Sequence, residues 1–68
     1  MDDDVFNMSL RKFLKKLGVT AQREIEARVR AGLAEGALSG NERLAAHATI
    51  VIDGLATPIT VDGQIALE

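Results

Sequence analysis

The 68-residue chain lacks cysteine altogether and has a single histidine, His47. A disulfide framework and thiolate metal sites are therefore excluded, and one histidine leaves little for a zinc site. We expect no metal and no cofactor. Aromatic side chains are also scarce, because Phe6 and Phe13 are the only two. A chain this short buries only about 60% of the surface that its unfolded form exposes, so its aliphatic core is marginal. Without disulfides or a metal, self-association is the remaining way to stabilise the fold.

The chain also lacks a long apolar run and an excess of positive charge. No run approaches the roughly 20 residues that cross a bilayer, and the start is acidic, unlike a signal peptide. We therefore expect a cytoplasmic protein with no membrane partner. A net charge of −2 and a pI near 5.3 argue against a surface devoted to polyanions. No Ser/His/Asp or Cys/His motif is present, so we expect no catalytic residue and no enzyme.

Helical periodicity fills the first half of the chain. One apolar stripe has the spacing of a helix that ends at Gly18. It consists of Phe6, Leu10, Phe13, Leu14 and Leu17. Asn7 or Ser9 could cap this helix, and Thr20 could cap a second helix from about Ala21 to residue 36. Two acid-first pairs four residues apart support the second helix, Glu24 with Arg28 and Glu26 with Arg30.

The second half follows a period of two. Residues 39–43 are a connecting loop by composition, and alternation from about His47 predicts a strand. Asp62-Gly63 indicates a hairpin, for which a three-residue loop that pairs Ile59 with Ile65 keeps the apolar residues on one face. A longer loop over residues 53–57, with the next strand beginning at Pro58 or Ile59, keeps Pro58 out of a strand interior. The predicted order is ααβββ.

These elements predict one α+β domain over residues 1–68, with two N-terminal helices followed by a short antiparallel sheet. Its parts are a flexible acidic tail (1–5), a helical half (6–36), the connecting loop (39–43) and a β half (46–68). The apolar face of the sheet has to be covered by helices or by a second subunit, so we expect a homodimer. Strand order, exchange of strands between subunits and a further protein partner stay open. Leu67-Glu68 is also the dipeptide that a common cloning junction leaves, so whether it is native is open as well.

Two segments resemble a known family. DVFNMSLRKFLKKLGVTAQREIE, residues 4–26, is similar to the opening of a family of small bacterial proteins known only as a domain of unknown function. VDGQI, residues 61–65, is similar to that family's C-terminal pattern. The resemblance implies a small cytoplasmic protein that forms oligomers, and it brings no activity, ligand or catalytic residue.

The stretch KKLGVTAQREIE, residues 15–26, has some features of a DNA-reading helix-turn-helix with Gly18 in the turn. Lys15 and Lys16 would then meet phosphates, and Gln22 and Arg23 would reach base edges. Two positions depart from that motif, since bulky Leu14 replaces a small residue and Glu24 replaces a buried aliphatic. We therefore favour a non-enzymatic structural or protein-interaction module. DNA binding through the Gly18 corner is the alternative.

Overall fold

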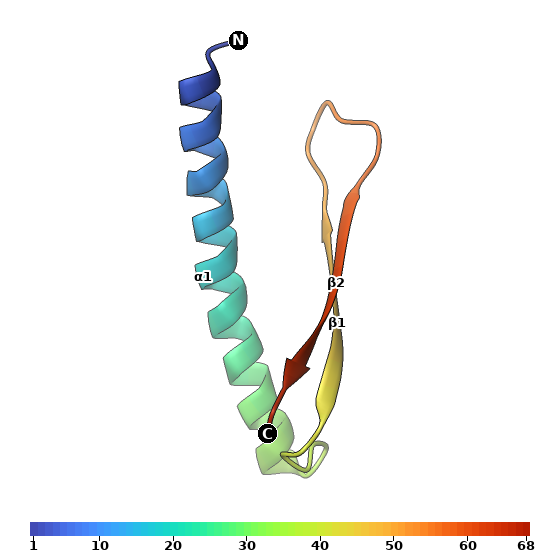
Figure 1. Cartoon of the computed structure of the whole chain (residues 1–68). Helices are drawn as coiled ribbons and strands as arrows, with labels where there is room; N and C mark the ends of the chain where they lie inside the picture. Colours follow the sequence, from blue (N-terminus) through green and yellow to red (C-terminus); the bar gives the residue numbers. More distant parts are fainter. The chain divides into compact units, whose positions relative to one another are not determined.

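The computed structural model describes all 68 residues and divides into two compact units, Met1–Ala37 and Leu38–Glu68, which are described separately. The first unit is the helix α1, Asp3–Glu35, and the second is a hairpin of β1, Arg43–Ile50, and β2, Ile59–Ala66 (Figure 1). The predicted α+β class is confirmed. The predictions of two helices and three strands are wrong, because the chain forms one helix and a two-stranded antiparallel sheet.

Both ends of α1 are capped by the chain itself. The Asp2 carboxylate accepts hydrogen bonds from the backbone N–H groups of Asp4 and Val5, at 3.0 and 3.2 Å. Asp3 and Asp4 fill the first turn, where negative charge stabilises the helix macrodipole. At the other end Gly36 adopts φ 81° and donates its N–H to the Leu33 carbonyl. The acidic residues assigned to a flexible tail therefore open the helix, and Asn7 and Ser9 lie inside it.

The helix passes through Gly18 without a corner. Gly18 is not among the glycines with positive φ, and Thr20 is an interior residue rather than a cap. A glycine in a helix interior costs only about 1 kcal/mol relative to alanine, and no proline interrupts the segment. The two predicted acid–base pairs form on its surface, with Arg28 3.3 Å from Glu24 and Arg30 3.7 Å from Glu26. Continuous hydrogen bonding over 33 residues thus outweighs the cost of a glycine at position 18.

The strands pair over eight positions, from Arg43 opposite Ala66 to Ile50 opposite Ile59. β2 runs straight through Asp62-Gly63, so the predicted hairpin there and the pairing of Ile59 with Ile65 are wrong. The chain instead reverses between residues 51 and 58, where Gly54 adopts φ 92° and Leu55 donates its N–H to the Ile52 carbonyl. The predicted longer loop before a strand at Ile59 is confirmed, but the loop is wider than the expected 53–57, because β1 already ends at Ile50.

The register explains why the Asp62-Gly63 signal fails. A hairpin at that point would leave strands of two or three residues, whereas the observed pairing uses all of β1 and β2. It also sends every large aliphatic side chain of both strands to one face. For all eight pairs to form, β1 has to begin at Arg43. The alternation had predicted its start four residues later, at about His47. No residue of the chain is buried, so neither unit has a core of its own.

Candidate interaction surfaces

The four residues predicted to touch DNA all lie on α1 and are exposed. Lys15 and Gln22 are seven residues apart, as are Lys16 and Arg23, so each pair lies about two turns apart on one side of a continuous helix. The Gln22 amide donates a hydrogen bond to Glu26 at 2.9 Å. Since no corner forms at Gly18, the helix-turn-helix that would place Gln22 and Arg23 on a separate reading helix is absent.

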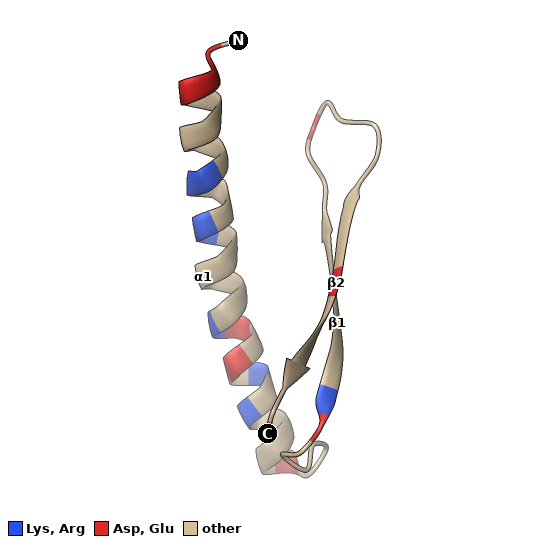
Figure 2. Ribbon diagram, viewed as in Figure 1, with Lys and Arg blue, Asp and Glu red and all other residues tan.

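The N-terminal half of α1 carries a basic cluster, defined as Arg11, Lys12, Lys15 and Lys16. These side chains fall within an arc of about 140° on an ideal helix, and Figure 2 shows positive charge along one side of this half. The only ion pairs in the structure are Glu24 with Arg28, Glu26 with Arg30 and His47 with Asp62. The basic cluster is therefore uncompensated and fully available to solvent or to an anionic partner.

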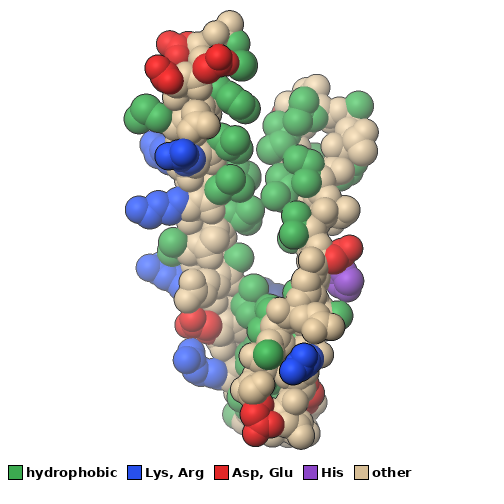
Figure 3. Space-filling view, viewed as in Figure 1, with side chains coloured by type: hydrophobic (Ala, Val, Ile, Leu, Met, Phe, Trp, Pro, Cys, Tyr) green, Lys and Arg blue, Asp and Glu red, His purple; other side chains and the backbone are tan.

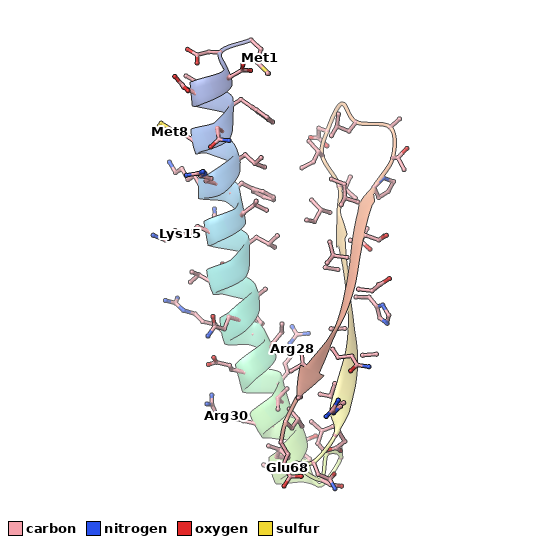
Figure 4. The ribbon with its side chains drawn as sticks, viewed as in Figure 1. Met1, Met8, Lys15, Arg28, Arg30 and Glu68 are labelled. Carbon is pink, nitrogen blue, oxygen red and sulfur yellow. The ribbon has the colours of Figure 1, made fainter.

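Opposite the basic cluster lies the N-terminal stripe, defined as Phe6, Leu10, Phe13, Leu14 and Leu17. These side chains occupy an arc of about 100°. Each is 38–50% exposed, so the stripe is an open apolar surface (Figure 3). Met8 and Lys15 point away from it (Figure 4). The sequence prediction of one helical stripe is confirmed.

The apolar residues change direction after Leu17. Four further positions continue in steps of four residues, namely Ala21, Ile25, Val29 and Leu33. Each step of four residues rotates the position by about 40° on a helix, so Leu33 points about 160° away from Leu17. One flat partner surface therefore cannot cover both Leu17 and Leu33. The helix therefore presents two apolar surfaces, the N-terminal stripe and a C-terminal ridge made of those four residues.

The hairpin has one apolar and one polar face. Successive residues of a strand alternate between faces, and directly opposed residues share one. The apolar face consists of the pairs Leu44–Ile65, Ala46–Gly63, Ala48–Val61 and Ile50–Ile59. None of these residues is buried. The predicted apolar face is thus confirmed, and nothing within the hairpin covers it.

His47 and Asp62 form a pair on the polar face. They are directly opposed, and Nδ1 of His47 lies 2.7 Å from Oδ1 of Asp62. Both side chains are 71% exposed, so water competes for the interaction, which is worth at most about 1 kcal/mol. His–carboxylate pairs also orient catalytic bases in enzymes. Here Thr49 and Thr60 form the adjacent rung on this face.

The start of the hairpin unit is organised by the Glu42 carboxylate. It accepts hydrogen bonds from the backbone N–H groups of Ser39 and Gly40, both at 2.8 Å, and of Asn41 at 3.1 Å. The bonds from Ser39 and Gly40 lower the pKa of the Glu42 carboxyl below its usual value. This arrangement fixes the residues that lead into β1. The three backbone N–H groups already bond to a carboxylate of the chain itself, in the place that an external anion could otherwise take.

No group of three or more His, Cys, Asp or Glu side chains is arranged to hold a metal ion. No helix combines the length and the apolar character needed to cross a membrane.

Sequence reasoning missed the roles of Asp2, Glu42 and the His47–Asp62 pair. Asp2 precedes the first helical turn and is a residue type favoured at that position, so a local signal was present. Glu42 and the His47–Asp62 pair depend on the turn geometry and on the strand register. The spacing of 15 residues between His47 and Asp62 has no local signature.

The family model for DUF6494, a family of unknown function, matches residues 1–68. The chain belongs to this family, and the resemblance seen in residues 4–26 and 61–65 is confirmed. The match also includes Leu67 and Glu68. No curated protein and no solved structure is significantly similar to the chain.

Proposed function

We propose that this protein is a non-enzymatic module that acts through self-association, with its apolar surfaces covered between two copies. The observation that carries the proposal is the absence of any buried residue in a chain with three apolar surfaces, the N-terminal stripe, the C-terminal ridge and the apolar face of the hairpin. Most of the stability of helices in proteins comes from packing of an amphipathic face, and a two-stranded hairpin alone is at best marginally stable. Both therefore gain most of their stability from a covering layer.

Sedimentation equilibrium at micromolar concentration tests the proposal. We expect a mass near twice 7.3 kDa and a melting temperature that rises with protein concentration. A monomer that melts cooperatively at a concentration-independent temperature would show that the surfaces are covered within one chain, and the proposal would be wrong.

Adjacent residues of β1 supply matched variants for the same measurement. Ile50 belongs to the apolar face and Thr49 to the polar face. Burying an isoleucine side chain contributes about 1.5–3 kcal/mol, so Ile50→Lys should weaken the dimer by about tenfold or more. Thr49→Lys places the same charge on the opposite face and should leave the mass unchanged.

DNA binding is the second candidate, supported by the uncompensated basic cluster alone. A titration with a generic duplex at low salt gives this candidate its best chance, because phosphate contacts are strongest there. Amide shifts confined to Arg11–Arg23 that vanish with added salt would support it. An unchanged spectrum would rule it out.

A further inference from the structure

Resting on the proposed self-association, we propose that the N-terminal stripe of α1 packs against the same stripe of a second copy, with the two helices antiparallel. The surface involved is one side of the first four turns of the helix, and the partner is a second α1.

The spacing within the stripe is that of a helix–helix seam. Phe6 and Phe13 are seven residues apart, as are Leu10 and Leu17, and the intervening steps alternate between four and three. This alternation keeps side chains in line toward a second helix that crosses at about 20°. The C-terminal ridge, with its steps of four, turns away from that line. The two halves of α1 therefore suit different partners, and the N-terminal half suits a helix.

The chain itself contains only one helix. A helical partner for the stripe therefore comes from another molecule, and a second copy supplies a stripe of the same length and composition. The stripe is open along its whole length, with Leu17 the least exposed member at 38% and Phe6 the most exposed at 50%.

The charge distribution favours the antiparallel orientation. A parallel pair would bring the acidic first turns together, with Asp2, Asp3 and Asp4 of both copies at one end, and would align the two macrodipoles. In an antiparallel pair with Leu10 facing Phe13, Asp3 lies level with Thr20 of the second copy. The two acidic turns are then about 25 Å apart. The basic cluster lies on the far side of both helices and stays in water.

Disulfide trapping tests the orientation, because the chain has no cysteine of its own. Asp3→Cys and Thr20→Cys place a thiol at each of two exposed positions. In the antiparallel pair, a mixture of the two variants should give a mixed disulfide dimer within minutes of mild oxidation, and either variant alone should give little. Rapid cross-linking of Asp3→Cys with itself would overturn the antiparallel arrangement.

A second pair of variants tests whether the stripe is used at all. Leu10→Glu changes the stripe, whereas Met8→Glu places the same charge on the opposite side, where Met8 is 73% exposed. Leucine and methionine have similar helix propensities, so the two changes affect the lone helix alike. We expect Leu10→Glu to weaken dimerisation by about tenfold or more and Met8→Glu to leave it unchanged.

The outcomes separate the two proposals. A wild-type dimer whose mass survives Leu10→Glu, with no mixed disulfide, would overturn the helix pairing while self-association stands. A wild-type monomer would overturn both.

Discussion

The helix α1 is stabilised by interactions between residues close in sequence, whereas the hairpin is stabilised by interactions between distant ones. In α1 every stabilising hydrogen bond and ion pair joins residues at most four positions apart, including the Asp2 cap and the pairs Glu24–Arg28 and Glu26–Arg30. In the hairpin the pairs span from 9 residues, between Ile50 and Ile59, to 23, between Arg43 and Ala66. Changes in α1 should therefore act locally along the helix, whereas changes in the hairpin depend on its register.

The units also differ in how they present apolar side chains. The strand period of two holds the whole apolar face of the hairpin in one plane. On α1 the apolar path rotates, because its steps change from an alternation of four and three to a run of fours. The hairpin thus offers one surface to one partner, and the helix offers two. Substitutions at Gly18, Asp2 and Glu42 test this contrast, and the largest effect is expected at Gly18.

Gly18 tests the continuity of α1 most severely. Gly18→Pro removes an interior N–H and forces a clash with the preceding turn, so we expect the helix to lose about 3 kcal/mol or more of stability. Gly18→Ala should instead stabilise it by about 1 kcal/mol, because nothing lies within 4 Å of the added Cβ. Circular dichroism through a thermal melt measures both. A corner glycine with positive φ would give the opposite sign for alanine, which would contradict a continuous helix.

Asp2 tests how far the helix depends on its own cap. Asp2→Ala removes the acceptor for the N–H groups of Asp4 and Val5, and loss of such a cap costs about 1 kcal/mol. We expect fraying confined to the first turn, seen as faster amide exchange at these two residues. Asp2→Asn keeps the acceptor and should behave nearly as the wild type does.

Glu42 should give the smallest effect, limited to the start of the hairpin unit. Its folded-state pKa is lowered from the ordinary 4.5, so its stabilising contribution is present above pH 4.5 and is lost as the pH falls through the folded-state pKa. The amide shifts of Ser39, Gly40 and Asn41 should titrate together in that acidic range. Glu42→Gln keeps the size of the side chain and should abolish this shared titration. If the three amides titrate unchanged in the variant, another carboxyl is responsible.

Periodicity predicted the apolar surfaces better than glycine predicted the turns. The N-terminal stripe and a single apolar face of the sheet follow from spacing, and the structure confirms both. Gly18 and Gly63 were each assigned to a turn, and both lie in regular structure without positive φ. A glycine permits a turn but does not require one, and the cooperative gain of extending a helix or a ladder decided both positions.

The candidate surfaces were only partly predictable. The Lys15, Lys16, Gln22 and Arg23 set was placed correctly on helical segments, but its grouping depended on a corner that does not form. The His47–Asp62 pair could not be foreseen, because it requires the register between two strands. That register is set by pairs as distant as Arg43 and Ala66, which no short motif encodes.

The two-stranded sheet has one further consequence, which concerns time scales. Each strand is an edge strand, so alternate amides of β1 and β2 point outward with no backbone partner in the chain. Deuterium should enter these outward amides within seconds, while the inward amides wait for the ladder to open. Slow exchange at the outward set would reveal that another strand lies against that edge.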